Sequence, residues 1–500
     1  MFLKPIEEIE VRHIIHKCDN KTSTDSDGIS MSIIKSVIDG CSKPLTYIFN
    51  LSFQSGKFPN SMKIAKVIPL YKSGDRHNIT NYRPISLLSQ FSKILEKLFD
   101  ARLDKFLDKH KILTEKQYGF RSNRSTTFAI TEFVEGVTSA WDNKKQTLGI
   151  FIDFQKAFDT INFEILFDKL ERYGIRGLVL KWIKSYLTNR RQFVSLGVHQ
   201  SDFLDIVCGV PQGSVLGPKL FILYINDICN VSELLNFVLF ADDTTIWASG
   251  EELLQQLLGL ITVELDKVKK WCDRNKLSLN LDKTKFMLFG YGRLNRQIQV
   301  RVGDANIERV YETKFLGINI DDKICWKPHI KYIHNKLAKS ISILARGKYI
   351  VDRKSLHTLY CSMFVPYLDY CVECWGNTYK SALCSLFKLQ KRAIRIVHGL
   401  GYRDHTNSSF AHSGFLKFFD LVKYKSAVFM YKVRYNLVPS GIRGLFGDRE
   451  GGYGLRGHLN LKTQAIRTTR KSFCISVSGV KLWNRLGDDL KQCTSVKQFK

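Results

Sequence analysis

Apolar runs of strand length end on carboxylates at two places in the chain. Phe237 to Ala241 is an apolar, β-prone run that meets Asp242 and Asp243, and a second β-prone run extends from Thr244 to Ala248. This pattern predicts a hairpin with acid at its turn. Asp is also a common turn residue that bonds its own backbone, so the pair alone does not require a metal.

A second strand with an acidic end is predicted earlier in the chain. Leu148 to Ile152 is apolar over strand length and stops at Asp153. We expect both strands in one sheet, with Asp153 and Asp242 as firm metal ligands and Asp243 more loosely placed, since neighbouring strand side chains point to opposite faces. Carboxylates suit hard divalent cations, and two Mg²⁺ ions would support nucleotidyl transfer to a 3′-hydroxyl.

Helical spacing of apolar residues surrounds these strands. Asp159 is predicted to cap a helix from Asn162 to Tyr173, and Pro218 to open an apolar helix that reaches Ile228. A loop rich in Gly and Pro carries Gln212, and glycine lets backbone approach a ligand closely. An ordinary tight connection explains the same loop.

Cations flank a further predicted strand at Val67 to Tyr71. Lys72 follows it directly, and Arg83 precedes a helical pattern that runs from Leu88 to Leu98. Cations placed this way suit phosphates, and the Arg fork suits bidentate contact. A solvated loop is an equally good interpretation of these residues alone.

Charge shifts the interpretation toward a polyanionic partner. The 500 residues carry 76 Lys and Arg against 47 Asp and Glu, a formal charge of +29, with 44% hydrophobic residues. Such a surplus favours nucleic acid through counterion release. No apolar run is long enough to span a membrane, and the acidic start MFLKPIEEIE does not fit a secretory signal, so we expect an intracellular protein without a membrane partner.

A predicted helix near residue 390 carries four cations on one stripe. They recur at helical spacing, at Lys388, Lys391, Arg392 and Arg395. Such stripes are usually solvated faces. On a chain this basic, after another cationic helix at Ile330 to Leu344, the stripe favours contact with a nucleic-acid backbone.

Seven motifs in order resemble the reverse transcriptases of non-LTR retrotransposons, of the jockey-like kind. They cover about residues 20 to 400 and are NYRPISLLS, QYGFRSNRSTTFAI, FIDFQKAFDTIN, GVPQGSVLGPKLFILYINDI, FADDTTI, LNLDKTK and KFLGINI. The resemblance implies an α+β fold of right-hand polymerase type, with fingers, palm and thumb. It further implies a ferredoxin-like antiparallel palm sheet and, with the helical spacing, a mostly helical C-terminal region.

The resemblance also implies roles for residues that match its motifs. Asp153, Asp242 and Asp243 would be the catalytic and metal ligands for two Mg²⁺ ions. The substrate-binding residues would be Lys72 and Arg83 on the incoming triphosphate, Phe158 as the gate against a ribose 2′-hydroxyl, Gln212 in the nucleotide pocket and Lys283 as a proton donor. Phe315, Leu316 and Gly317, in a predicted short strand from Lys314 to Ile320, would form the primer grip.

Four regions are expected from the resemblance and the helical patterns. They are a helical extension at 1–60, reverse transcriptase fingers and palm at 61–320, a thumb-like helical region at 321–400 and a C-terminal region of unknown role at 401–500. The implied partners are an RNA template, a DNA primer and target, and deoxynucleoside triphosphates, in nucleus and cytoplasm. We expect no room for an endonuclease before residue 60, and hence a partial reading frame.

Two other functions fit parts of the pattern. A catalytically inactive or domesticated relative that only binds RNA would share the charge and the fold. An RNA-dependent RNA polymerase would share the palm. The presence of all three carboxylates argues against the first, and an aromatic residue at Phe158 favours deoxynucleotides over ribonucleotides.

Overall fold

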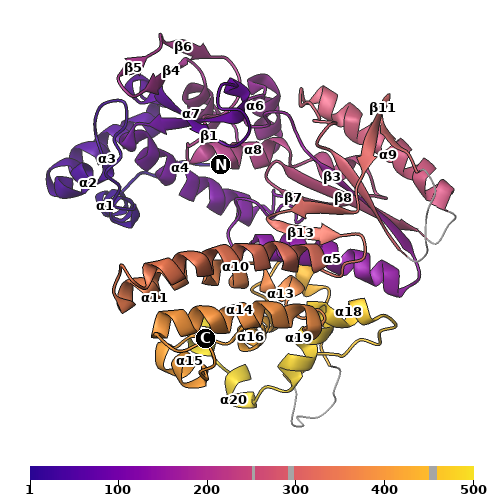
Figure 1. The fold of residues 1–500 in the computed structure, drawn as a ribbon. Helices are drawn as coiled ribbons and strands as arrows, with labels where there is room; N and C mark the ends of the chain where they lie inside the picture. The colour runs from indigo at the N-terminus through magenta and orange to yellow at the C-terminus, as the bar shows by residue number, and fades with distance from the viewer. Residues whose placement is uncertain (251–253, 291–297, 450–458) are drawn as a thin grey trace. The chain divides into compact units, whose positions relative to one another are not determined.

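A computed structural model describes the chain apart from residues 251–253, 291–297 and 450–458 (Figure 1). The described residues form two units, each assembled from three stretches of chain. The first takes Met1–Phe120, Asp153–Ser232 and Lys267–Asn280, and the second takes Arg121–Ile152, Glu233–Asp266 and Leu281–Lys500. The division between Ile152 and Asp153 falls where the predicted strand ends.

The helices of the first unit pack around large aromatic side chains. They are α1 (Glu8–Lys17), α2 (Met31–Ser36), α3 (Ile38–Ser55), α4 (Gln90–Lys109), α6 (Phe163–Arg172), α7 (Leu178–Leu187) and α8 (Leu216–Tyr224). Trp182 of α7 stacks on Phe99 of α4 with 4.2 Å between ring centroids, and it meets Phe53 of α3 edge-on. All three rings are buried, so their apolar surface holds these helices together.

Two helix predictions in this unit are wrong in detail. The cap of α6 is Asn162, whose side chain accepts a hydrogen bond from Ile165 N at 3.1 Å, so Asp159 does not cap this helix. Pro218 is the third residue of α8, which ends before Ile228. Proline fits there because the first N–H groups of a helix have no intrahelical partner.

The sheet of the first unit has the strand order β2-β1-β4-β5, with β6 paired to β4. The strands are β1 (Ile64–Tyr71), β2 (Tyr82–Leu88), β4 (Arg190–Leu196), β5 (His199–Gln200) and β6 (Leu204–Ile206). The predicted strand before Lys72 is confirmed as β1. The segment that leads into the predicted helix is the antiparallel partner β2, an edge strand, which tolerates Pro84. The helical pattern from Leu88 to Leu98 is confirmed by α4, which begins at Gln90.

The second unit is built on a sheet with the order β10-β11-β9-β3-β8-β7. The strands are β3 (Gln146–Ile152), β7 (Asn236–Phe240), β8 (Asp243–Gly250), β9 (Lys285–Phe289), β10 (Val300–Val302) and β11 (Ala305–Arg309). The two predicted acid-tipped strands are therefore confirmed and share one sheet. Its neighbours are antiparallel except β11 and β9, which run parallel, so the sheet is mixed rather than wholly antiparallel.

Helix α5 (Thr126–Asp142) packs on this sheet through Phe133. The Phe133 ring lies 5.3 Å from Trp247 of β8 and 5.7 Å from Phe151 of β3, measured between centroids. Ser125 caps the helix by accepting a hydrogen bond from Phe128 N at 3.3 Å. The packing explains why β3 is apolar almost throughout.

The segment Lys314–Ile320 is a hairpin rather than a single strand. It comprises β12 (Glu312–Phe315) and β13 (Ile318–Asp321), which pair antiparallel. Leu316 and Gly317 form the two-residue turn with φ of 44° and 89°. Positive φ at both positions is the backbone that two-residue hairpins of this twist require, and glycine supplies it readily.

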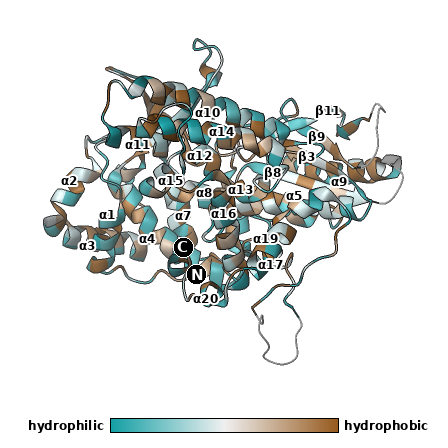
Figure 2. Ribbon diagram, turned by 60° about the horizontal axis from the view of Figure 1, so that its bottom comes forward, coloured by the Kyte–Doolittle hydropathy of each residue, from teal (hydrophilic) through white to brown (hydrophobic). Residues whose placement is uncertain are grey.

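The rest of the second unit is helical, as predicted. Its helices are α10 (Lys327–Gly347), α11 (Arg353–Met363), α12 (Val365–Asp369), α13 (Val372–Trp375), α14 (Lys380–His398), α15 (Asn407–Ser413), α16 (Phe418–Arg434), α17 (Ser440–Arg443), α18 (Thr469–Phe473), α19 (Ile475–Asn484), α20 (Asp488–Lys491) and α21 (Val496–Phe499). Figure 2 shows hydrophilic and hydrophobic residues alternating along α10 and α14, as expected for helices buried on one face. Part of the glycine-rich stretch near residue 450 lies outside the described residues.

Helix α9 (Leu254–Arg274) follows the acid-tipped hairpin, as its apolar spacing predicts. Across the part of the chain that the structure describes, every helix is too short or too polar to cross a lipid bilayer.

Candidate active site

The predicted acidic turn connects β7 to β8. Phe240 and Asp243 are paired across the hairpin, so Ala241 and Asp242 form its two-residue turn. Ala241 has φ of 55°, a conformation that a residue with a Cβ rarely adopts. Asp242 and Asp243 are exposed, whereas Thr244 behind them is buried. A turn held in unfavourable backbone therefore presents two adjacent carboxylates at the end of a buried hairpin.

The register of β3 against β8 pairs the residue before the other predicted acid with the residue after Asp243. Ile152, the last residue of β3, is paired with Thr244, the residue after Asp243. The next residue along the chain is Asp153, which is partly buried and whose carbonyl accepts a hydrogen bond from Asn280 N at 2.8 Å. Within the described residues, no group of three or more His, Cys, Asp or Glu side chains is arranged so that it could hold a metal ion.

The residues predicted to bind the triphosphate lie on one hairpin of the first unit. Arg83 of β2 is paired with Leu70 of β1, and Lys72 continues the ladder by donating its N–H to Asn81 O at 2.9 Å. Side chains two positions apart on a strand share a face, so Lys72 and Arg83 lie on the same face of the hairpin. Both side chains are exposed, which suits cations that meet a phosphate from solvent.

Gln212 and Phe158 lie in adjoining segments of the same unit. The backbone carbonyl of Gln212 accepts a hydrogen bond from Ser86 N at 2.8 Å, and this bond attaches the Gln212 loop to β2. Its side-chain Nε2 donates to Asp159 Oδ1 at 2.9 Å. Phe158 is partly buried, with its ring 4.5 Å from that of Phe221 in α8. The first unit thus brings the nucleotide-pocket candidates into one hydrogen-bonded neighbourhood.

The remaining family positions belong to the second unit. Lys283 is exposed in the turn that leads into β9, the strand beside β3. Phe315 is buried with its ring 5.7 Å from Phe151, one residue before the end of β3. Leu316 O accepts a hydrogen bond from Tyr370 Oη at 2.6 Å, and a Cβ on Gly317 would come within 3.0 Å of the Tyr370 ring. Tyr370 therefore holds the predicted primer-grip turn, and Phe315, which precedes the turn, packs near the end of β3.

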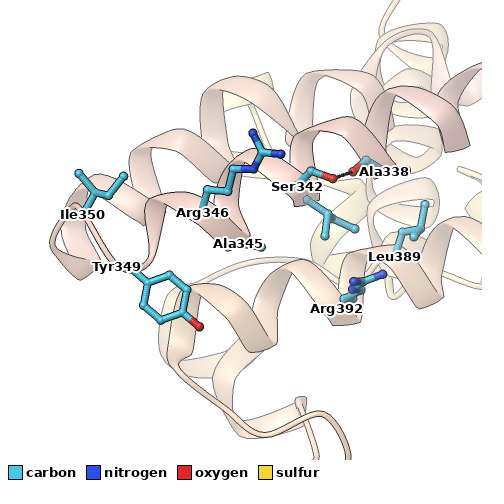
Figure 3. A pocket seen from close by; sticks show the side chains of 9 residues that line it. Ala338, Ser342, Ala345, Arg346, Tyr349, Ile350, Leu389 and Arg392 are labelled. Atoms are coloured by element: carbon cyan, nitrogen blue, oxygen red, sulfur yellow. Dashed lines mark hydrogen bonds between the residues drawn. The ribbon is translucent and has the colours of Figure 1, made fainter.

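The four cations of the predicted stripe all lie on α14, and Arg392 lines a hollow between α14 and α10. Figure 3 shows Arg392 together with Arg346 and Tyr349, which belong to α10 and the turn after it. The cavity measures about 590 Å³. Two guanidinium groups at one hollow form a positive site on this face of the unit.

The other members of the stripe are arranged differently. Lys391 and Arg395 line a second hollow of about 500 Å³, where the Lys391 ammonium lies 5.0 Å from the Phe387 ring centroid. Arg395 Nε donates to Asp404 O at 2.9 Å, and Lys388 is exposed. The stripe is therefore divided between two hollows rather than forming one continuous surface.

Sequence reasoning missed Glu96 of α4, which fixes the end of the Gln212 loop. Glu96 is fully buried, and its Oε2 accepts hydrogen bonds from Val215 N at 2.7 Å and Leu216 N at 3.1 Å. A carboxylate is favourable at these first N–H groups of α8 because they carry partial positive charge. The only signal in the sequence is an acid between apolar helix positions, and it does not indicate the partner.

Comparison with known proteins identifies the family of the chain. A model of the family described as reverse transcriptase (RNA-dependent DNA polymerase) matches residues 71–320, half of the chain. That range includes the acidic hairpin, Asp153, Lys72, strand β2 with Arg83, and the turn at Leu316.

Curated relatives come from mobile elements. The chain is 28% identical over 421 residues to a probable RNA-directed DNA polymerase from transposon BS of Drosophila melanogaster, covering 80% of this chain and 45% of the relative. It is 29% identical over 404 residues to the RNA-directed DNA polymerase from mobile element jockey of the same organism, covering 78% and 43%. The chain thus spans less than half the length of these relatives. It belongs to the reverse transcriptase (RNA-dependent DNA polymerase) family, and its predicted resemblance to the enzymes of non-LTR retrotransposons is confirmed.

Proposed function

We propose that this chain extends a DNA 3′-hydroxyl on an RNA template, as the polymerase portion of a non-LTR retrotransposon. In this proposal residues 61–320 are the fingers and a palm with a ferredoxin-like sheet, and residues 321–400 are the thumb. Residues 1–60 are a helical extension, and the role of 401–500 is left open. The names of the relatives, which specify RNA-directed DNA polymerases, support the activity.

The metal site of the proposal consists of Asp153, Asp242 and Asp243. Their donor chemistry fits Mg²⁺, which prefers carboxylate oxygens and needs only one or two of them when substrate phosphates complete its shell. Two bound ions would lower the pKa of the attacking 3′-hydroxyl and stabilise the charge on the leaving pyrophosphate. The exposure of Asp242 and Asp243 leaves their oxygens accessible to such a substrate.

One observation carries the proposal. Thr244, which follows the two acids of the turn, is paired with Ile152, which precedes the third. This pairing supports a shared role for acids that come from two separate motifs.

The nucleotide contacts are assigned to the side chains that match the motifs of the family. Lys72 and Arg83 would hold the triphosphate, with the Arg fork able to make two parallel hydrogen bonds. Phe158 would exclude a 2′-hydroxyl, and Gln212 would line the pocket. Lys283 would donate a proton to pyrophosphate, which is consistent with its exposed position before β9.

The nucleic-acid contacts are assigned to the second unit. Phe315, Leu316 and Gly317 would hold the primer end, supported by the packing of Phe315 against Phe151. The cations of α14, namely Lys388, Lys391, Arg392 and Arg395, would contact the backbone of an RNA template or a DNA primer and target. Their separation into two hollows suggests two phosphate contacts rather than one.

Primer extension tests the proposal. The parent protein, given an RNA template, a DNA primer, deoxynucleoside triphosphates and Mg²⁺, should extend the primer. Asp242→Ala should lower the rate at least about a thousandfold, a loss of ~4 kcal/mol of transition-state stabilisation. The matched control is Asp304→Asn, an exposed acid in the turn between β10 and β11 of the same sheet, which should keep the parent rate.

Two results would replace the proposal with an alternative. Equal extension, or none, by parent and Asp242→Ala would leave an inactive RNA-binding relative. Extension with ribonucleoside triphosphates in preference to deoxynucleoside triphosphates would indicate an RNA-dependent RNA polymerase.

A further inference from the structure

Two segments that are far apart in sequence run side by side next to the proposed nucleotide pocket. Val210 N donates to Phe158 O at 2.8 Å, and Gly209 N donates to Ile161 O at 2.9 Å. These bonds align residues 158–161 with the loop that ends at Gln212. The position of Gln212 is therefore coupled to the segment that carries the proposed sugar gate.

Two glycines make this alignment close. A Cβ on Gly209, whose φ is 80°, would lie 2.6 Å from Asp159 O, and a Cβ on Gly213, whose φ is 129°, would lie 2.5 Å from Ser86 O. Both contacts are with backbone, which cannot move aside as a flexible side chain can. The loop thus packs closely between the backbone of Asp159 and that of Ser86, and the backbone of Gln212 has little conformational freedom.

The side chain of Gln212 is fixed by a different contact. Its Nε2 donates to Asp159 Oδ1 at 2.9 Å. An ionised carboxylate only accepts hydrogen bonds, so the amide must turn its nitrogen toward Asp159 and its oxygen away. Asn162 already caps α6, which leaves the Asp159 carboxylate without a role at that helix end. Its side-chain contact is with the proposed nucleotide-binding amide.

We propose that Asp159 is a positioning residue that holds the amide of Gln212 in one orientation toward the incoming nucleotide. This inference rests on the proposed function, in which Gln212 lines the nucleotide pocket. A carboxylate at this position selects the rotamer in which Gln212 Oε1 is available to the ligand. Preorganisation of this kind lowers the entropy that is lost when the nucleotide binds.

The effect should fall on nucleotide binding rather than on chemistry. Asp159→Ala releases the Gln212 amide, and the KM for the deoxynucleoside triphosphate should rise on the order of tenfold, since a hydrogen bond to a charged group is among the stronger ones. The kcat should change less than about twofold, because the reacting atoms are not touched. Asp159→Asn should fall between, since an Asn amide can accept from Gln212 without forcing its orientation.

A double-mutant cycle separates positioning from independent contributions. Gln212→Ala and Asp159→Ala/Gln212→Ala should have the same KM within about twofold, because Asp159 acts only through Gln212. A double variant whose KM is the product of the two single effects overturns the proposal. So does an Asp159→Ala protein with the parent KM.

Controls distinguish this result from loss of fold and from failure of the proposed function. Asn162→Ala removes the neighbouring helix cap and should lower the unfolding midpoint while keeping the parent KM. Coupling of Asp159 to Gln212 in the unfolding midpoint but not in KM would make the contact structural only and overturn the proposal. A parent protein that extends no primer refutes the proposed function and this role with it, whereas an active parent without coupling refutes this role alone.

Discussion

Carboxylates occur in two opposite settings in the second unit. Asp242, in a two-residue turn with unfavourable backbone at Ala241, and Asp243, the first residue of β8, are exposed. Glu135 of α5 is 1% exposed and pairs with Lys471 of α18, whose Nζ lies 2.6 Å from Glu135 Oε2. Ser476 completes the buried site, with its N at 2.8 Å from Oε1 and its Oγ at 2.7 Å from Oε2.

The difference shows how the same functional group is used for structure or for a ligand. Glu135 is surrounded by donors from the protein itself, which a buried charge requires. Asp242 and Asp243 are instead exposed to solvent, next to a turn residue, Ala241, that has a positive φ. The buried acid should therefore govern stability, and the exposed acids should govern activity.

Breaking the buried pair should give the largest effect on stability. Lys471→Met leaves the Glu135 carboxylate buried with no cation, and the free energy of unfolding should fall by about 3–5 kcal/mol. Chemical unfolding of the purified protein measures this. Lys481→Met removes an exposed lysine from the adjacent helix α19 and should change stability by less than about 0.5 kcal/mol.

The partner variant completes this test. Glu135→Leu/Lys471→Met removes both charges, so it should be clearly more stable than Lys471→Met alone. A double variant no more stable than the single one would mean that the packing of α18, rather than the unpaired charge, sets the loss.

A buried histidine, His329, should make the stability of the protein depend on pH. Burial lowers the pKa of His329 in α10 from 6.5 to about 4, and its Nδ1 accepts a hydrogen bond from Asn319 N at 3.3 Å. Above pH 6.5 both folded and unfolded chains hold this imidazole neutral, so its full contribution to stability is present. As the pH falls from 6.5 toward 4 the unfolded chain takes up a proton that the folded chain does not, and stability should drop by about 2–3 kcal/mol.

Unfolding followed from pH 7.5 to pH 4 checks the sign and the window. His329→Gln should be less stable at neutral pH but should lose this part of the pH dependence. His334→Gln, on the same helix and less buried, should retain it. A parent protein whose stability rises as the pH falls through this window would contradict the assignment.

The sequence predicts those parts of the fold and site that depend on neighbouring residues. The β7–β8 hairpin and β3 follow from local apolar runs, and both are confirmed. The contact of Glu135 with Lys471 spans 336 positions, and no local pattern at either residue indicates the other.

Misread local signals account for the remaining differences. Asp159 is a residue type that often caps helices. Asn162 is the actual cap, because a cap side chain bonds the backbone N–H three positions later, here that of Ile165. The sequence does not predict the Leu316–Gly317 turn, because the apolar residues on both sides of it indicate one continuous strand. Roles of site residues came from family resemblance rather than from spacing, because a hydrogen bond such as that of Gln212 to Asp159 depends on tertiary packing.

The smallest stability effect is expected where the activity effect is largest. Asp242→Asn and Asp243→Asn each remove one of two adjacent negative charges from an exposed turn, so the free energy of unfolding should change by less than about 1 kcal/mol in either direction. The same two proteins, assayed for primer extension, should lose activity because an amide is a weaker ligand for Mg²⁺ than a carboxylate. Chemical unfolding beside the extension assay, on one preparation of each variant, gives both numbers. A loss of several kcal/mol in stability would show that these acids support the hairpin, as Glu135 supports the contact between α5 and α18. Their exposure between β7 and β8 would then be explained without a role in catalysis.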